Sequence, residues 1–555
     1  MIRAVPGAKW VRDRIWRVPR SWASCLTLRG VFGDRLEIGE QLLAWSWAEH
    51  NDRISPALAA RDLALDPDAD AEGDERLRSY QRTGIAFLVA SSGAVLADDM
   101  GIGKTVQTIF ALEQLGAYPA LVVCPKTVKR GWVDEFARWA PHRSVTVVTT
   151  GSSKARQLNA DTDVTVINYE SLRTASRLAP YGSVRLTPAE KIPGPLNRPW
   201  AALVADEAHK AKDPASKQTR ALWAVGATAR YRFALTGTPV ANTPEDFWSL
   251  LHFVSPSEWP RKTTFIDRYC EVSHDWHGGV SIDGFREATK QEFFAAADPR
   301  FLRRPKALVL PHLPPKTYER RWVEMSPKQA KAYRDMEKDQ VAFLDNDSTV
   351  AAFDQLTLLA RQSQFASAYG EAVWLDGEDG VRKCKVTLTE PSSKCEAVME
   401  LLTEIGNEPL VVFAQSRQLI DLMQTRLIRA TIPHGRITGS ENEKVRQMAK
   451  DDFISGHSRV LLLTLGAGST GLDGLQNVAS TACFMQRSFN AVENAQAEDR
   501  IHRLGQNAGK VTIVDLIAPD TVEESVVLPS LEGKASLLEE VTRDREILRK
   551  VLCRK

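Results

Sequence analysis

The chain has 555 residues, of which 43% are hydrophobic and 26% are charged, and its formal net charge is +2. These values are typical of a globular protein, and no apolar run reaches the roughly 18 residues that a membrane span requires. The seven cysteines form no C-x-x-C pair, which argues against structural zinc and a disulfide framework. The basic N-terminus lacks the apolar segment of a secretory signal. We therefore expect an intracellular protein without membrane spans, and its length predicts three or four domains.

Residues 1–75 are predicted to form an accessory module followed by a linker. The run VPGAKWVRDRIWRVPR predicts two short strands, one ending at Trp10 and one starting at Ile15, and the first fifty residues hold Trp10, Trp16, Trp22, Trp45 and Trp47. Rings interleaved with arginines suit nucleic acid, because both stack on bases while the charges meet phosphate. The alternative is a β-hairpin that uses its tryptophans as core. Residues 61–75 are acidic and contain proline and glycine, which predicts a linker.

Residues 76–254 alternate short apolar strands with amphipathic helices, which predicts a doubly wound parallel sheet. In AVLADDMGIGKT, a strand is followed by a glycine turn and the start of a helix, the arrangement that binds phosphate at a helix N-terminus. The stretch departs from G-x-x-x-x-G-K-[ST] because Asp98 stands in place of the first glycine. The predicted ATP-binding residues here are Asp99, Met100, Gly101, Ile102, Gly103, Lys104 and Thr105. Lys104 would reach the phosphates and the Thr105 hydroxyl would hold Mg²⁺, whereas the alternative is an ordinary glycine turn.

Three further motifs lie near strand ends or ahead of this loop. In AALVADEAH, Asp206 can hold Mg²⁺ and Glu207 can orient or deprotonate the attacking water, although such a pair is commonly just a helix N-terminus. Gln81 precedes the loop, where its amide can read adenine or can simply lie on a helix surface. In LTGTP, the hydroxyls of Thr236 and Thr238, on either side of Gly237, can sense the γ-phosphate or cap a helix.

Residues 255–390 break this rhythm and are predicted to be a helical protrusion or linking region. The basic run RRPK contains Arg303, Arg304 and Lys306. These residues are expected to contact the phosphate backbone of DNA, and the alternative is a solvated basic loop. Residues 326–344 are predicted to be helical and residues 377–390 to form a hairpin. No chemistry is assigned to that hairpin.

Residues 391–520 resume the alternation, so we expect a second α/β domain, which lacks a phosphate loop of its own. Its glycine-rich stretch is predicted to contact nucleic acid through Gly468, Ser469, Thr470 and Gly471. In QAEDRIHRLGQ, Arg500 and Arg503 stand three apart on an expected helix and so share a face. They can act as arginine fingers, and the alternative is a surface salt bridge. Residues 521–555 are predicted to end in an amphipathic brace helix.

Taken in order, YQ, DDMGIGKT, LVVCP, DEAH, LTGTP, VVFAQS, GAGSTGLDGLQ and QAEDRIHRLGQ resemble the motor ATPases of superfamily two of the Swi/Snf type. The resemblance implies two RecA-like domains with helical protrusions, ATP and Mg²⁺ as cofactors, and translocation along double-stranded DNA without strand separation. It also explains Asp98, since A-D-D-M-G-x-G-K-T is the form that the family uses. The segments DRYCEV and FLRRPK look most like the annealing-helicase subgroup, which remodels or rewinds forked DNA.

The resemblance implies a site assembled from Gln81, the phosphate loop, Asp206 and Glu207, and completed by Arg500 and Arg503. Two alternatives remain open from the sequence. One is a helicase directed to RNA or single strands, or the motor of a restriction system. The other is a DNA clamp that uses ATP only as a conformational ligand, and the complete DEAH motif with both arginines argues against it.

Overall fold

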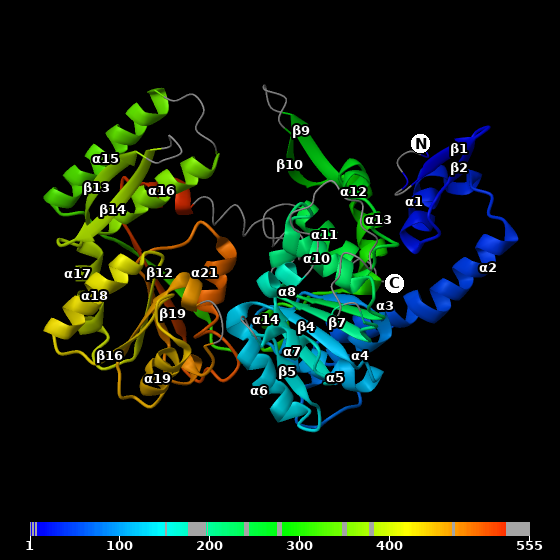
Figure 1. The fold of residues 1–555 in the computed structure, drawn as a ribbon, viewed down its shortest axis with the longest axis horizontal. Coiled ribbons are helices and arrows are strands. Elements are labelled where there is room, and N and C mark those ends of the chain that lie inside the picture. Colours follow the sequence, from blue (N-terminus) through cyan, green and yellow to red (C-terminus); the bar gives the residue numbers. More distant parts are fainter. Residues whose placement is uncertain are drawn as a thin grey trace. The chain divides into compact units, whose positions relative to one another are not determined.

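The computed structural model describes residues 2, 5, 8–149, 153–175, 196, 198–237, 244–274, 280–346, 352–376, 382–468 and 472–528. The chain divides into two compact units, one formed by Met1–Pro311 and one that begins at His312. Each unit is built around its own parallel sheet with helices on both faces (Figure 1). The predicted fold class, two doubly wound parallel-sheet domains with helical insertions, is confirmed.

The sheet of the first unit has seven parallel strands in the order β11-β3-β8-β7-β4-β6-β5. Their bounds are β3 Ala94–Leu96, β4 Ala120–Cys124, β5 Val145–Val147, β6 Val164–Asn168, β7 Ala202–Asp206, β8 Tyr231–Leu235 and β11 Phe301–Leu302. The four strands β3, β4, β6 and β7 are buried throughout. Strands covered on both faces need continuous apolar runs, which is why the sequence shows them as such.

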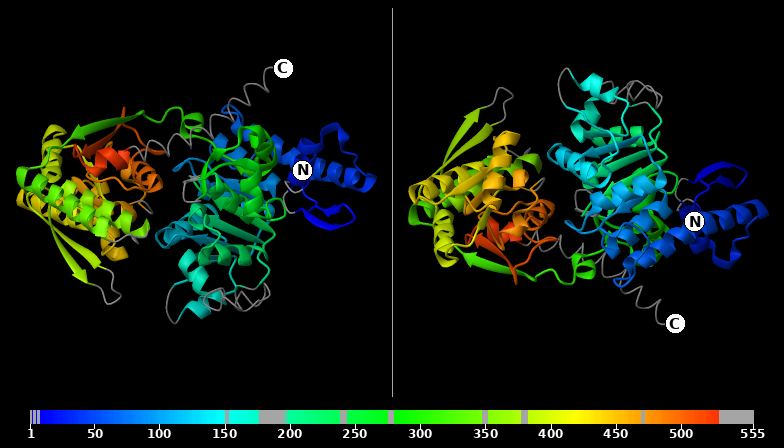
Figure 2. Two further views of the ribbon diagram at one scale, coloured as in Figure 1. Left: turned by 90° about the horizontal axis from the view of Figure 1, so that it is seen from above. Right: turned by 90° about the horizontal axis from the view of Figure 1, so that it is seen from below.

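Helices cover both faces of this sheet (Figures 1 and 2). One face is packed by α4 Ser79–Ser91, α5 Lys104–Leu115 and α6 Lys129–Trp139, through side chains such as Leu88, Ile109 and Phe136. The other helices of the unit that follow the phosphate loop are α7 Lys154–Leu158, α8 Tyr169–Ala175, α10 Lys217–Gly226, α11 Glu245–Val254, α12 Lys262–Tyr269, α13 Glu287–Ala297 and α14 Lys306–Val309. Helices α8, α10 and α11 contact one another in sequence order. An antiparallel pair, β9 Cys270–His274 and β10 Val280–Phe285, lies outside the main sheet.

The second unit has six parallel strands in the order β12-β19-β18-β15-β17-β16. Their bounds are β12 Lys316–Trp322, β15 Leu410–Ala414, β16 His434–Ile437, β17 Val460–Thr464, β18 Thr481–Phe484 and β19 Val511–Ile517. The helices are α15 Pro327–Asn346, α16 Ala352–Ser367, α17 Ser393–Glu404, α18 Arg417–Arg429, α19 Glu443–Ile454, α20 Leu465–Gly468 and α21 Ala491–Glu498. Two buried apolar clusters contain alternate residues of β15, such as Val412 and Val411, so the core lies on both sides of the sheet.

The helix predicted in the linking region is present in this unit as α15. The hairpin predicted for residues 377–390 is wrong in its bounds, because its first strand, β13 Tyr369–Asp376, precedes that stretch and only β14 Arg382–Thr389 lies in it. Residues 377–381 lie outside the described residues. Throughout the part of the chain that the structure describes, no helix is both long and apolar enough to cross a membrane.

Several of the described strands were not predicted from the sequence, among them β9, β10, β11, β12 and β16. Strand β11 has only two residues, and β16 has only four, of which two are partly exposed. Strand β12 is the edge strand of its described sheet; five of its seven residues are exposed, and four of the seven are charged. Edge strands commonly carry charges, so they lack the apolar run that marks a central strand.

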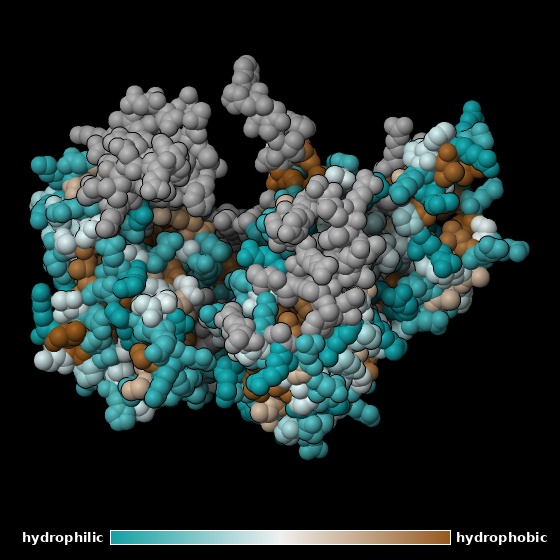
Figure 3. Space-filling model, viewed as in Figure 1, coloured by the Kyte–Doolittle hydropathy of each residue, from teal (hydrophilic) through white to brown (hydrophobic). Residues whose placement is uncertain are grey.

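The N-terminal segment forms the predicted hairpin from β1 Lys9–Arg12 and β2 Ile15–Arg17, with Trp10 opposite Trp16. Of the two tryptophans in the hairpin, Trp10 is 62% exposed and Trp16 is only partly buried, so the alternative of a hairpin that uses its tryptophans as core is wrong. Trp22 and Trp45 are partly buried, and Trp47 is 66% exposed. Hydrophobic surface is visible over this part of the molecule (Figure 3). The helices here are α1 Trp22–Phe32, α2 Glu40–Glu49 and α3 Ser55–Leu65.

Helix α3 also corrects the predicted linker at residues 61–75, because it continues to Leu65. Its Arg61 is 6% exposed, and Nε donates to the Phe301 carbonyl at 3.1 Å. The start of α1 is held by Glu258, whose carboxylate accepts from the amides of Trp22 and Ala23 at 3.1 and 2.7 Å. These contacts attach the N-terminal segment to the rest of the first unit.

The five-part division predicted from the sequence remains a prediction. The boundary between the two units follows Pro311, inside the expected linking region 255–390. The residues before it contribute β11 to the first sheet, and those after it contribute β12 to the second. Of the expected brace region 521–555, residues 529–555 lie outside the described residues.

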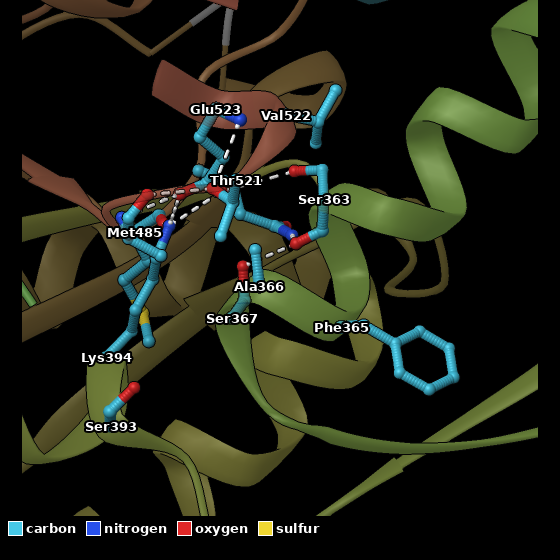
Figure 4. Close-up of polar contacts among 12 residues, drawn as sticks. Ser363, Phe365, Ala366, Ser367, Ser393, Lys394, Met485, Thr521, Val522 and Glu523 are labelled. Atoms are coloured by element: carbon cyan, nitrogen blue, oxygen red, sulfur yellow. Dashed lines mark hydrogen bonds and ion pairs between the residues drawn. The ribbon is translucent and has the colours of Figure 1, made fainter. Parts of the chain in front are cut away.

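A buried ion pair fastens the carboxyl edge of the second sheet (Figure 4). Lys394, at the start of α17, is fully buried, and its Nζ lies 2.6 and 2.5 Å from the two carboxylate oxygens of Glu523. The same ammonium donates to the Met485 carbonyl at 2.7 Å, just after β18, and Glu523 follows β19. The Glu523 carboxylate also accepts from the Ala518 amide at 3.2 Å and from the Ser363 hydroxyl at 3.3 Å.

Replacing Glu523 with glutamine is expected to destabilise the second unit by about 3–5 kcal/mol, because Lys394 would remain buried without its counter-charge. Urea unfolding, followed by hydrogen exchange of α17, measures the change. Glu400→Gln, an exposed position on the same helix, should stay within about 0.5 kcal/mol of wild type. The double change Lys394→Met with Glu523→Met should recover stability relative to Glu523→Gln, and equal losses would contradict the prediction.

Candidate active site

The predicted phosphate loop connects β3 to the N-terminus of α5. Two of its residues have a positive φ, Gly101 at +78° and Gly103 at +92°. A Cβ atom built on Gly103 would lie 2.5 Å from Nε2 of Gln81, so both the backbone angle and the space require glycine. The first turn of α5 follows directly, with its backbone amides directed toward the loop. This arrangement fits the phosphate groups of a nucleotide.

The side chains of Lys104 and Gln81 both contact the backbone of this loop. Lys104 Nζ donates to the carbonyl oxygens of Asp98 at 2.8 Å and Asp99 at 3.1 Å. Gln81 is 7% exposed, and its amide nitrogen lies 3.4 Å from the Ile102 carbonyl. The interpretation of Gln81 as a surface residue of a helix is therefore wrong.

The sheet register brings the Asp-Glu motif level with the phosphate loop. Leu96 of β3 pairs with Leu235 of β8, which pairs with Asp206 of β7. Neighbouring strands are about 4.8 Å apart, so the backbones of Leu96 and Asp206 are separated by about 10 Å. Both strands end here, and the polar residues that follow them share the carboxyl edge of the sheet. Ligands of open α/β sheets bind at this edge.

Asp206 is a buried carboxylate held in a fixed orientation. It is 9% exposed, and its two oxygens accept from Trp132 Nε1 at 2.8 Å and from the Glu207 amide at 2.9 Å. Burial raises the pKa of Asp206 above its ordinary value, and the neighbouring charge of Glu207 raises it further. A carboxylate in such surroundings gains from a nearby cation.

The residues that fit Mg²⁺ are Asp206 and the partly buried Thr105, the first hydroxyl residue of α5. Among the residues that the structure describes, no three acidic, histidine or cysteine side chains gather into a metal-binding group. Mg²⁺ usually binds one or two carboxylates together with phosphates and water, rather than a cage made by the protein. The donor set therefore suits a metal ion that binds together with a nucleotide.

Glu207 and its neighbours link the motifs of the first unit. Glu207 has a φ of +50°, which is uncommon for a residue with a side chain and occurs often at functional sites. Nδ1 of His209 lies 3.3 Å from Glu207 Oε2 and 3.4 Å from Thr236 Oγ1. The Thr236 amide donates to the Leu96 carbonyl at 3.1 Å. The DEAH and LTGTP motifs are thus in contact through His209.

Gly237 adds a contact between LTGTP and the phosphate loop. A Cβ atom on Gly237 would lie 2.6 Å from Cγ of Met100, so the methionine side chain packs against this glycine. The third residue predicted here, Thr238, lies outside the described residues.

The pKa of His209 predicts a pH dependence of stability. Burial lowers it from the ordinary 6.5 to about 4, helped by the charges of Lys210, Lys212 and Lys104. Below pH 6.5 the unfolded chain therefore takes up a proton that the folded chain accepts only near pH 4, and stability falls as the pH falls through this window. We expect His209 to cost the first unit about 2 kcal/mol between pH 7.5 and pH 5. Urea unfolding of wild type and His209→Gln at both pH values measures this difference, and equal pH slopes would contradict it.

In the second unit, Arg500 and Arg503 lie beside one carboxylate. Arg500 Nη1 is 3.8 Å from Asp473 Oδ1, and Arg503 Nη1 donates to the same oxygen. The expected helix is wrong at this point, because α21 ends at Glu498. Ile501 is buried, and Gln506 donates to the carbonyls of Ala479 and Ile501, both at 2.9 Å, so the chain turns to follow the core.

The predicted DNA-contacting residues of this unit are only partly described. Gly468 is the last residue of α20. Ser469, Thr470 and Gly471 lie outside the described residues.

The interpretation of the basic run at 303–306 is wrong in both of its forms. Arg304 is fully buried, and Lys306 is 8% exposed. Arg303 Nη2 lies 3.8 Å from Asp99. The run therefore lies along the phosphate loop, and Arg304 is neither on DNA nor in solvent.

Sequence reasoning also missed residues that hold the site together. Trp132 was one of many tryptophans, and no spacing links it to Asp206. Tyr80 donates through its hydroxyl to the Ile102 carbonyl at 3.0 Å, and Arg304 pairs with Asp98, which is 206 positions away. One sequence signal pointed to Arg304: Asp98 directly follows an apolar strand, and a carboxylate buried there requires a buried cation as its partner.

Two models of known protein families match this chain. The model of the SNF2-related domain matches residues 40–366, and the model of the helicase conserved C-terminal domain matches residues 393–505. The chain is 30% identical over 472 residues to the mouse protein "Chromodomain-helicase-DNA-binding protein 1-like", covering 81% of this chain and 48% of that protein. It is 27% identical to the "ISWI chromatin-remodeling complex ATPase ISW1" of Saccharomyces cerevisiae, covering 81% and 39% of the two chains.

A bacterial relative is named as a helicase. The "Uncharacterized ATP-dependent helicase MG018" of Mycoplasma genitalium is 28% identical, with 81% of this chain and 41% of that protein covered. This chain thus spans less than half the length of these relatives. Among solved structures, the "Sulfolobus solfataricus SWI2/SNF2 ATPase core in complex with dsDNA" is 24% identical and covers 81% of this chain and 89% of that chain, with a TM-score of 0.38. The annealing-helicase subgroup remains a prediction.

Proposed function

Because this chain belongs to the SNF2-related family of helicase-like ATPases, we propose that it hydrolyses ATP and uses the energy to move along double-stranded DNA. The observation that carries the proposal is the register that joins Leu96, Leu235 and Asp206. It brings the phosphate loop and the Asp-Glu motif to one edge of one sheet. Phosphoryl transfer to water needs both groups within reach of a single triphosphate.

In this proposal, Lys104 exchanges its present acceptors, the carbonyls of Asp98 and Asp99, for phosphate oxygens. Asp206 and Thr105 would hold Mg²⁺, which would supply positive charge to neutralise the phosphates. Glu207 orients and deprotonates the attacking water. Gln81 reads the adenine edge, for which its amide must leave the Ile102 carbonyl.

The second unit contributes Arg500 and Arg503, which stabilise the charge that develops on the phosphates. Coupling to DNA runs through Thr236, Gly237 and Thr238 in the first unit and through residues 468–471 in the second. The contact of His209 with both Glu207 and Thr236 supports the first of these routes.

Two observations support DNA as the partner. Relatives of this chain carry "DNA-binding" and "chromatin-remodeling" in their names. The hairpin of residues 9–17 exposes Trp10 together with Lys9, Arg12, Arg14 and Arg17, a combination that suits stacking on bases and contact with phosphates.

The test compares ATP turnover in the presence of blunt duplex, forked duplex, single-stranded DNA and RNA. Duplex DNA is expected to stimulate turnover most, and displacement of a triplex-forming strand from the duplex reports movement. If forked DNA stimulates ATP turnover more than blunt duplex does, that result supports remodelling or reannealing of forks. Preferential stimulation by RNA or single strands would overturn duplex translocation, and intact DNA binding without turnover would indicate a clamp.

A further inference from the structure

The phosphate loop begins at a buried ion pair. Asp98, which stands where the sequence pattern has its first glycine, is fully buried, and so is Arg304. Arg304 Nη2 lies 2.5 Å from Oδ2 of Asp98, and its Nε lies 3.1 Å from Oδ1. This two-pronged geometry is specific to arginine, because the guanidinium presents its donors in a rigid plane.

The remaining contacts of Arg304 reach the other end of the loop. Its Nη2 also donates to Gln107 Oε1 at 2.8 Å, and Gln107 Nε2 donates to the Gly103 carbonyl at 3.2 Å. Its Nη1 donates to the Tyr80 carbonyl at 2.5 Å, while the Tyr80 hydroxyl holds the Ile102 carbonyl. Arg304 is therefore connected directly to Asp98, the first residue of the loop, and indirectly to Ile102 and Gly103 near its end.

The backbone around Arg304 follows the loop as well. Strand β11 pairs with β3, and beyond it the amides of Ala97 and Asp99 donate to the carbonyls of Leu302 and Arg304 at 2.7 and 3.1 Å. The Lys306 amide donates to the Asp99 carboxylate at 2.9 Å. Residues 302–306 thus form a continuous backing for the first half of the loop.

Helix α4 is shaped to admit the guanidinium. A Cβ atom on Gly84 would lie 2.6 Å from Arg304 Nη2 and 2.0 Å from Gln107 Oε1. Only glycine leaves this space at that position of the helix, although glycine costs helical stability. The helix, the loop and the segment 302–306 are therefore fitted to one another around Arg304.

We propose that Arg304 is a positioning residue for nucleotide binding, which acts through Asp98 to fix the conformation of the phosphate loop. In the usual loop the first glycine makes the tight turn possible. In this chain, the buried carboxylate of Asp98, held by Arg304, fixes the backbone conformation at the start of the loop. The inference rests on the proposed function only in that the loop binds ATP, and it does not depend on movement along DNA.

The experiment measures the dissociation constant of a fluorescent ATP analogue with the full chain. Arg304→Gln and Asp98→Asn are each expected to raise it about 10- to 100-fold, by analogy with the loss of a side chain that supports a metal ligand. Arg300→Gln is the matched control. Arg300 is also buried in the same segment, but it donates to the carbonyls of Ser91 and Gly93 at 2.9 and 3.2 Å, at the opposite end of β3. It should lower the unfolding midpoint and leave nucleotide affinity unchanged.

Asp98→Gly gives the sharpest contrast, because it restores the pattern G-x-x-x-x-G-K-T. If the loop needed only its glycine, affinity for ATP would stay or improve, and that result would overturn the inference. We expect a loss comparable to that of Asp98→Asn. Arg304→Lys keeps the positive charge but loses the planar pair of donors, and it serves as the test if Arg304→Gln does not fold. Wild-type affinity for the ATP analogue in Arg304→Lys would also overturn the inference. A wild-type chain that does not bind ATP would instead contradict the proposed function.

Discussion

Replacing Glu207 with glutamine is expected to lower the turnover of ATP by about 100-fold or more, while ATP and DNA still bind. General-base catalysis typically contributes a factor of about 10² to 10⁴, and the amide keeps the shape of the side chain but cannot accept the proton. Turnover is measured at saturating ATP and DNA, and binding is measured separately with a fluorescent nucleotide and labelled duplex.

The matched control for this change is Glu170→Gln. Glu170 also follows a strand at the carboxyl edge of the first sheet, where its carboxylate accepts from Asn168 Nδ2 at 2.6 Å. It has no proposed role in hydrolysis, so turnover should remain close to wild type. Unchanged DNA-stimulated turnover in Glu207→Gln would remove Glu207 from the mechanism and would weaken the proposed function as a whole.

The central strands of both sheets were predictable because burial on two faces leaves an unmistakable run of apolar residues. Strand β4, Ala120–Cys124, and strand β15, Leu410–Ala414, are buried at every position. The polar motifs follow such strands directly, so their gathering at one edge of each sheet could be predicted as well. Edge strands were not predictable in this way, since β12 is the edge strand of the sheet as the structure describes it, and four of its seven residues are charged.

What surrounds the motifs depends on pairings between residues far apart in the sequence. The indole of Trp132 orients Asp206 over a separation of 74 positions, and Arg304 holds Asp98 over 206. A single sequence contains no periodicity or spacing for such pairs. The basic run at 303–306 was interpreted from its charge alone, and charge alone cannot distinguish a cation in solvent from one that neutralises a buried carboxylate.

The sequence allows two interpretations of Arg500 and Arg503, a surface salt bridge and a pair of arginine fingers. The salt bridge predicted as the alternative is present, because Asp473 lies beside Arg500 and Arg503, whose side chains are 13% and 23% exposed. A salt bridge of this kind contributes little stability, with a typical value below about 1 kcal/mol. It is also compatible with a catalytic role, since Asp473 can hold the two side chains in place until a phosphate replaces it.

Substitution of Arg500 or Arg503 by alanine is expected to lower turnover about 10³-fold, the lower end of the range for an arginine finger, with little change in ATP affinity. Affinity should persist because the phosphate loop belongs to the first unit. Arg429→Ala, an exposed arginine in the last turn of α18, is the control for a general loss of charge and should turn over ATP normally.

Asp473→Asn decides between the two roles. If the arginines act on the nucleotide, this variant keeps most of its turnover, because both side chains remain and only their resting partner has changed. If the arginines serve only to hold Asp473, all three substitutions break the same contact and should reduce turnover to the same degree. Turnover that falls with either arginine but survives the loss of Asp473 would therefore assign the pair to catalysis, and equal losses would assign it to the local structure of the second unit.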